Sequence, residues 1–244
     1  MESIISLKWA HIQNCYLCKQ VSDNLICETC ENALPFLKTT LEETVPSSLV
    51  RSASAENLLT LPNVSKALGN ITFNRLICPM LYRWPIDFMI KQFKFSRSDY
   101  LTQSLCKYLL HDLELQLNDT TRPDIIIPVP IHIKRYGTRR FNQATLIAEH
   151  LSHGLAIPLN THFCKRQQFA FAQSQLGGDK RRKNLKRAFS AEPMLGIKRV
   201  AIVDDVITTG ATVEALSRAI KHRNPHINID VWTLAISDKN LGLD

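Results

Sequence analysis

Long apolar runs are missing from this chain of 244 residues. A membrane-spanning helix needs about 20 consecutive apolar residues, and no stretch approaches that length. Residues 1–14 also lack the apolar core of a secretory signal peptide, because Lys8 and His11 interrupt them. We therefore expect a cytoplasmic protein that does not insert into a membrane.

The chain also lacks a set of cysteines that could all be paired, because it has seven. An odd number in a reducing compartment argues against a disulfide framework. Three cysteines sit singly on apolar stretches and are expected to be buried small hydrophobes: Cys78, Cys106 and Cys164.

The other cysteines form a C-x2-C-x8-C-x2-C pattern made by Cys15, Cys18, Cys27 and Cys30. Two thiolates separated by two residues can face one ion, and two such pairs complete the tetrahedral shell that suits Zn2+. Four protein ligands leave no open position for water, which favours a structural role. Two unrelated thiol pairs, or a redox-active C-x-x-C pair, are the alternatives.

Acidic residues are scarce in one part of the chain. Between Ile131 and Ser190, twelve Lys and Arg residues accompany two acidic residues, whereas the remainder has 18 basic and 20 acidic residues. The net charge of +8 therefore comes from one segment, which implies a local anionic partner. Aromatic residues are sparse beside these cations, so a single-stranded nucleic acid would find few stacking platforms.

Three parts follow one another along the sequence. Residues 1–37 form the cysteine module, the Ser/Thr/Glu-rich residues 38–75 are a linker or a loosely packed excursion, and residues 76–244 form an α/β domain. In the domain we expect strands at 76–82, 124–130, 200–203 and 229–236, helices at 85–95, 100–117, 141–151 and 211–223, and a loop or hairpin at 161–190. This alternation predicts a mainly parallel sheet flanked by helices on both faces.

The most informative stretch is 200–212, which reads VAIVDDVITTGAT. Four apolar residues predict a buried strand, and Asp204 and Asp205 follow at its carboxyl end, where open α/β sheets bind ligands. A loop of small and hydroxyl residues then opens a helix, and such a loop offers backbone N–H groups to a phosphate. Its members are Thr208, Thr209, Gly210, Ala211 and Thr212. Carboxylates accept hydrogen bonds from sugar hydroxyls, so a ribose 5-phosphate fits both halves of this pattern. An ordinary strand followed by a capped helix is the alternative.

Two basic segments could serve the same crevice. The segment 128–143 begins where a strand ends, and Lys134, Arg135, Arg139 and Arg140 could face a pyrophosphate, with Asn142 and Gln143 offering amides. A solvated basic loop is the alternative there. The run 177–189 could be a lid hinged at Gly177 and Gly178, a nucleic-acid contact within 165–187, or a solvated surface.

Taken together, these motifs resemble the 5-phosphoribosyl-1-pyrophosphate (PRPP) signature of type I phosphoribosyltransferases and, over about 15–30 and 76–237, the ComF/GntX family of competence-associated, phosphoribosyltransferase-like proteins. The resemblance rests on the four cysteines, the R-x-F-N-Q segment ending at Gln143, the Asp-Asp-x-x-Thr-Thr-Gly strand and a Q-x-x-L-x(4)-R-x-x-N pattern from Gln173 to Asn184. The sequence departs from it where Arg140 replaces a glycine, and where 31–77 lack further cysteines.

The resemblance implies a fold, a ligand and roles. Asp204 and Asp205 would hold the ribose hydroxyls, and residues 208–212 the 5-phosphate. Pro130 and the loop after it would face the pyrophosphate and its Mg2+; further pyrophosphate or lid candidates are Lys134, Arg135, Arg139, Arg181 and Asn184. The expected activity is phosphoribosyl transfer to an unidentified acceptor. A non-catalytic sensor of PRPP or a nucleotide, and a DNA-associated factor in DNA uptake, are the alternatives.

Overall fold

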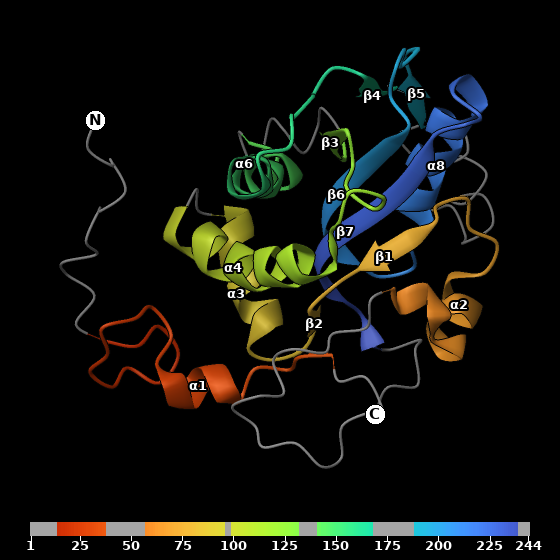
Figure 1. Cartoon of the computed structure of the whole chain (residues 1–244). Coiled ribbons are helices and arrows are strands. Elements are labelled where there is room, and N and C mark those ends of the chain that lie inside the picture. Colours follow the sequence, from red (N-terminus) through yellow and green to blue (C-terminus); the bar gives the residue numbers. More distant parts are fainter. Residues whose placement is uncertain (1–13, 38–56, 96–98, 132–140, 168–187, 239–244) are drawn as a thin grey trace, which may run out of the picture. The chain divides into compact units, whose positions relative to one another are not determined.

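The computed structural model describes residues 14–37, 57–95, 99–131, 141–167 and 188–238 (Figure 1). The chain forms two compact units, Met1–Leu34 and Pro35–Asp244. In the first unit, a short helix, α1 (Glu28–Asn32), begins directly after Cys27, which occupies its N-cap position. The turn that precedes it in sequence is closed by the Cys15 carbonyl, which accepts from the Lys19 N–H at 3.0 Å.

The second unit is built on a parallel sheet in the order β1-β7-β6-β3, with β2 also pairing with β7. The strands are β1 (Arg75–Ile77), β2 (Met80–Leu81), β3 (Ile125–Pro128), β6 (Arg199–Ile207) and β7 (Asn228–Ile236). Of the two long strands, β7 is buried from Ile229 to Ile236, and β6 has an apolar, buried stretch from Val200 to Val203. Such runs are typical of parallel strands that are covered on both faces.

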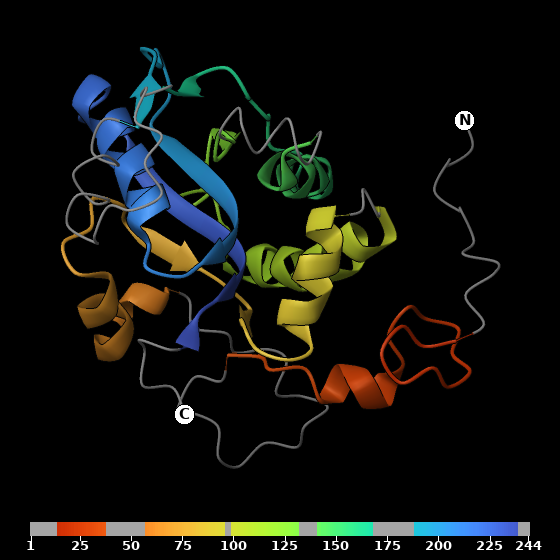
Figure 2. The ribbon, with the colours of Figure 1, turned by 180° about the vertical axis from the view of Figure 1, so that it is seen from behind.

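Helices cover both faces of this sheet, as Figures 1 and 2 show. On one face lie α3 (Ile86–Phe95), α4 (Asp99–Gln116) and α6 (Gln143–Leu155), and on the other lies α8 (Ala211–Arg223). In α8, Val213, Leu216 and Ile220 recur at helical spacing and share a buried core with Val200 and Ile202 of β6. The predicted mainly parallel α/β architecture is confirmed.

A buried charge cluster fastens three strands together near their amino ends. Asp230 of β7 is fully buried, and its carboxylate lies 2.9 Å from Arg199 of β6 and 3.5 Å from Arg75 of β1. Burial raises the pKa of Asp230, and the two guanidinium groups oppose that rise. The cluster therefore links β1, β6 and β7 near their amino ends. The residues that the sequence singles out for ligand binding lie at the other, carboxyl ends of the strands.

Three elements differ from the sequence prediction. The strand expected at 76–82 is divided into β1 and β2, because Pro79 has no N–H to donate to β7. The strand expected at 200–203 continues to Ile207 as β6, so the paired aspartates belong to the strand rather than following it. The excursion expected at 161–190 is a hairpin at its described ends, where β4 (Cys164–Arg166) pairs antiparallel with β5 (Phe189–Ala191).

The predicted linker contains ordered, packed structure in its described part. A 3-10 turn, η2 (Leu58–Thr60), leads into α2 (Pro62–Leu68). Leu58, Val64 and Phe73 are buried and belong to the same core cluster as α8. The Ser/Thr/Glu-rich composition of 38–75 hides these apolar anchors, because Val64 and Phe73 each stand between polar neighbours and Leu58 lies in a short Leu-Leu pair.

Among the helices of the described segments, none has both the length and the apolar character needed to cross a membrane.

Candidate functional site

The paired aspartates lie near the carboxyl end of β6, the second strand from the edge formed by β3. Both side chains are partly exposed, whereas Val203 before them is fully buried. One oxygen of the Asp204 carboxylate accepts from the Asp205 N–H at 2.9 Å, and one of Asp205 accepts from the Val206 N–H at 2.8 Å. The chain itself thus orients each carboxylate at the edge of the sheet where ligands of open α/β folds bind.

The loop after β6 leads directly into the amino end of α8. Thr208 and Thr209 are exposed, and Gly210 occupies the N-cap position with φ +70° and ψ −6°. This left-handed conformation is one that glycine adopts without steric cost. The first N–H groups of a helix have no partner within the helix and carry the positive end of its dipole. Together with Ala211 and Thr212, this loop has the local geometry of an anion-binding helix start.

The end of β3 reaches the same edge. Pro128 is in register with Val203, and the Val129 N–H donates to the Val203 carbonyl at 2.9 Å. Pro130, which is partly exposed, comes next in the chain. The structure therefore brings Pro130 and the paired aspartates to one edge on neighbouring strands, as the sequence predicts.

Asn142 and Gln143, whose amides the sequence offers to a ligand, are engaged within the fold or buried. The Asn142 side chain accepts from the Ala144 N–H at 3.2 Å, which caps α6, and donates to the Val129 carbonyl at 3.0 Å. Gln143 is 3% exposed. Asn142 thus fixes the start of α6 against the end of β3, because an N-cap amide satisfies a helix N–H while its NH2 group remains a donor.

The remaining predicted cations and amides fall outside the residues that the structure describes. These are Lys134, Arg135, Arg139, Arg140, Arg181 and Asn184, together with the hinge at Gly177 and Gly178. Of the segment 165–187, residues 165–167 are described, and there Arg166 lies over the Phe189 ring at 5.1 Å.

The four cysteines of the first unit converge as their spacing predicts. The sulfur atoms of Cys15, Cys18, Cys27 and Cys30 all lie within 4.8 Å of one another. A tetrahedral Zn2+ site with Zn–S bonds of about 2.3 Å requires sulfurs about 3.8 Å apart, so the cluster needs only a small contraction to hold the ion.

Two of the clustered thiols have shifted pKa values, and the shifts differ in direction. Burial acts to raise the pKa of Cys15, but hydrogen bonds from the backbone of Cys27, Cys18 and Leu17 lower it to about 6. Burial, followed by the neighbouring thiols, raises the pKa of Cys30 to about 12. Four thiolates cannot crowd together without a cation, so this donor set fits Zn2+. The three isolated cysteines are buried, as predicted.

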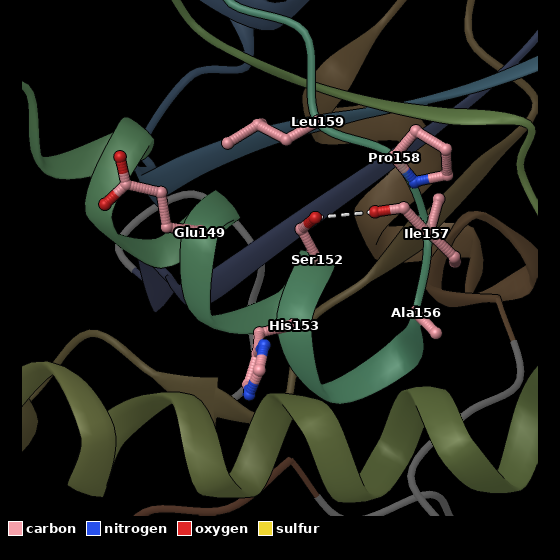
Figure 3. Close-up of a pocket in the computed structure, with 7 residues that line it drawn as sticks. All are labelled: Glu149, Ser152, His153, Ala156, Ile157, Pro158 and Leu159. Atoms are coloured by element: carbon pink, nitrogen blue, oxygen red, sulfur yellow. Dashed lines mark hydrogen bonds between the residues drawn. The ribbon is translucent and has the colours of Figure 1, made fainter.

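A shallow hollow of about 620 Å3 lies elsewhere, against the last turn of α6 and residues 156–159 (Figure 3). Glu149 and His153 line it, and the Ser152 hydroxyl donates to the Ile157 carbonyl at 2.6 Å across it. Leu159 pairs with Ile126 near the start of β3, so the hollow is not at the carboxyl edge. It contains none of the residues that the sequence predicts for ligand binding.

Sequence reasoning missed the residues that support the loop after β6. Thr233 of β7 is fully buried and donates its hydroxyl to the Asp205 carbonyl at 3.0 Å. Leu68 at the end of α2 approaches Gly210, and Thr72 bonds to Glu214 in the first turn of α8. The position of Thr233 inside an apolar strand is a signal that could have identified it. Nothing in the sequence marks Leu68 or the Thr72–Glu214 bond.

Comparison with known proteins supplies relatives but no matching family model. The chain is 36% identical over 163 residues to competence protein F of Haemophilus influenzae, covering 63% of this chain and 69% of that protein. It is 33% identical over 165 residues to the DNA utilization protein YhgH of Salmonella typhi, covering 66% and 72% respectively. A purine phosphoribosyltransferase from Pyrococcus horikoshii superposes with a TM-score of 0.36 at 19% identity, over 66% of this chain and 78% of that one.

The fold and the site define a parallel α/β protein in which a strand with paired carboxylates runs into a small-residue helix start. The curated relatives then narrow the class, because the match extends over more than two thirds of each. The chain belongs to the ComF/GntX family, which includes competence protein F and the DNA utilization protein YhgH, and its four-cysteine cluster fits zinc.

Proposed function

We propose that the chain binds PRPP together with Mg2+ at the carboxyl edge of β6 and transfers or recognises its phosphoribosyl group. The observation that carries the proposal is the direct succession of Asp204 and Asp205, an exposed threonine loop and the start of α8. It offers hydrogen-bond acceptors for a sugar and donors for a phosphate a few residues apart, and few ligands other than a ribose 5-phosphate need both.

In this proposal each part of the site has one task. Asp204 and Asp205 accept hydrogen bonds from the ribose 2- and 3-hydroxyls. Residues 208–212 donate N–H and hydroxyl groups to the 5-phosphate at the positive end of the α8 dipole. Pro130 and the loop after it face the pyrophosphate, for which Lys134, Arg135, Arg139, Arg181 and Asn184 remain candidates from the sequence.

The chemistry of transfer requires positioning more than acid or base groups. The bond between C1 of the ribose and the pyrophosphate oxygen breaks and the pyrophosphate leaves with its electron pair, while a nitrogen nucleophile forms the new bond to C1. Holding the sugar and the 5-phosphate fixes C1 relative to the nucleophile, and donors at the leaving diphosphate stabilise its charge. Mg2+ neutralises part of that charge, and PRPP oxygens would supply most of its ligands.

The relatives' names support a biological context in the use of DNA. One is a competence protein and the other a DNA utilization protein, and we propose the same biological context here. The reduced thiols required for a zinc cluster suit the cytoplasm. The basic content of 165–187 favours contact with DNA as the second candidate function, and a non-catalytic PRPP sensor would use the same site without turnover.

The proposal is tested by thermal unfolding of the full chain with PRPP and MgCl2. PRPP should raise the melting temperature of the wild type, and Asp205→Ala combined with Thr209→Ala should abolish the shift. Asp119→Asn, at an exposed turn after α4, is the matched charge control and should keep it. Absence of any shift in the wild type would refute PRPP binding.

Turnover and DNA contact need separate measurements. The protein is mixed with PRPP and each of a panel of nucleobases in turn, and pyrophosphate should be released when the nucleobase is the acceptor. Release that is lost when Asp205 is replaced identifies a transferase. PRPP binding without release for any acceptor indicates a sensor. DNA affinity that falls steeply with salt and is unaffected by PRPP would identify a DNA contact elsewhere on the chain.

A further inference from the structure

The segment from Asn57 to Asn74 is held against the sheet at both ends. The Asn57 side chain donates to the Asn74 carbonyl at 3.1 Å and accepts from the Leu76 N–H at 3.0 Å. The Asn74 side chain accepts from the Ile229 N–H at 2.9 Å. The two asparagines therefore fix the segment that carries α2 to the start of β1 and β7.

Between these ends the segment is bonded to the first turns of α8. Glu214 accepts from both the N–H and the hydroxyl of Thr72, at 2.8 and 3.2 Å. Glu214 also pairs with Arg218, whose guanidinium donates to the Asn70 carbonyl at 3.4 Å. Because Glu214 lies in the first turn of α8, this network restrains the helix start that follows the loop.

Leu68, the last residue of α2, packs at the loop itself. A Cβ atom placed on Gly210 would stand 2.7 Å from one Leu68 methyl carbon, which shows how closely that side chain approaches. Leu68 is partly buried against the core cluster. Within the loop, the bond from the Ala211 N–H to the Thr209 hydroxyl is long, at 3.5 Å.

We propose that Leu68 and the Thr72–Glu214 bond are positioning elements that hold the loop 208–212 in its ligand-binding conformation. A loop that is already ordered loses less conformational entropy when it binds, so its affinity is higher. These residues act through the loop and touch no ligand. The identity of the ligand as PRPP rests on the proposed function, whereas the support of the loop does not.

Amide hydrogen exchange in the full chain tests the support without a ligand. The reporter is the Glu214 N–H, which donates to the Gly210 carbonyl at 2.9 Å and closes the first turn of α8. Leu68→Ala should speed its exchange by about tenfold or more, as expected when a local contact is lost. Leu68→Met should restore slow exchange, because it refills the same space.

Leu61→Ala provides the matched control. Leu61 precedes the same helix and is likewise partly buried against the core cluster, so both variants remove the same side-chain atoms from a partly buried position. Faster exchange at Glu214 in Leu68→Ala alone supports the proposal. Equal exchange in the two variants overturns it, since the loop would then depend only on the stability of the whole segment.

PRPP affinity separates this proposal from the proposed function. If the wild type binds PRPP, Leu68→Ala should weaken binding by several-fold while Leu61→Ala leaves it within about twofold, a gap attributable to pre-organisation. Equal affinity of the two variants counts against positioning. Failure of the wild type to bind PRPP refutes the proposed ligand, and the exchange result still decides whether Leu68 supports the loop.

Discussion

Replacing Gly210 with alanine is the perturbation whose cost can be worked out most fully. Gly210 has φ +70°, and its added Cβ would meet Leu68 at 2.7 Å. Gly196 offers a comparison, because it has φ +77° and no atom within 4 Å of its added Cβ. The two substitutions share the backbone strain, and only the first adds a steric conflict.

The backbone strain and the steric conflict contribute different amounts to the free energy of unfolding. An alanine in the left-handed region costs roughly 1–2 kcal/mol, of which about 0.4–1 kcal/mol is offset by reduced freedom of the unfolded chain. Gly196→Ala should therefore cost roughly 1 kcal/mol. Moving the Leu68 methyl group off its rotamer adds about 0.5–1.5 kcal/mol at Gly210, which gives roughly 2 kcal/mol. For a domain of this size about 1 kcal/mol lowers the melting temperature by 2–4 °C.

The assay is thermal unfolding of both variants, followed by the double variant Gly210→Ala with Leu68→Ala. We expect melting temperatures lowered by about 4–8 °C for Gly210→Ala and about 2–4 °C for Gly196→Ala. In the double variant the alanine at 210 should cost only the backbone strain, since the conflicting methyl group is gone. Equal losses for the two single variants, or strict additivity in the double variant, would refute the packing of Leu68 on Gly210.

Two further predictions concern the sheet and the thiols. Asp230→Ala leaves two largely buried guanidinium groups without their counter-charge and should cost roughly 3 kcal/mol of stability. Asp87→Ala breaks an exposed i,i+4 pair with Lys91 and should change stability by less than about 0.5 kcal/mol. Similar melting temperatures for the two variants would contradict the structural role of Asp230. Burial raises the pKa of Cys164 to about 12 and also raises that of the other isolated thiols, Cys78 and Cys106. A thiol reagent should therefore leave the native zinc-loaded protein unmodified, modify the four clustered cysteines after chelation, and reach all seven only on unfolding. Less than about half a zinc per chain by metal analysis would contradict the four-thiolate site.

The sequence predicts those helices and strands in which apolar residues follow one regular pattern. The helix expected at 211–223 is α8 with the same bounds, because Val213, Leu216 and Ile220 mark one face. The last strand is also recovered within one residue, since most of its residues are apolar and only Asp230 and Thr233 interrupt them. The cysteine cluster is predicted because each C-x2-C pair can turn both thiols toward one ion.

The sequence fails where a residue acts through a distant partner. Asn142 reads as an amide offered to a ligand, and the Val129 carbonyl that engages it lies on another element. Leu68 reads as part of a linker, because the Gly210 that it approaches is 142 residues away along the chain. Contacts of this kind depend on how the elements pack, which local patterns do not encode.

The central claim is that neighbouring carboxylates bind the sugar while the loop after them binds the phosphate. The most direct measurement compares, by calorimetry, the affinities of ribose 5-phosphate and 2-deoxyribose 5-phosphate for the wild type. Losing a hydroxyl that donates to a carboxylate costs about 1.5–3 kcal/mol, so the deoxy sugar should bind roughly ten- to hundredfold more weakly, and Asp204→Asn with Asp205→Asn should reduce that difference. Equal affinities for the two sugars in the wild type would contradict the claim.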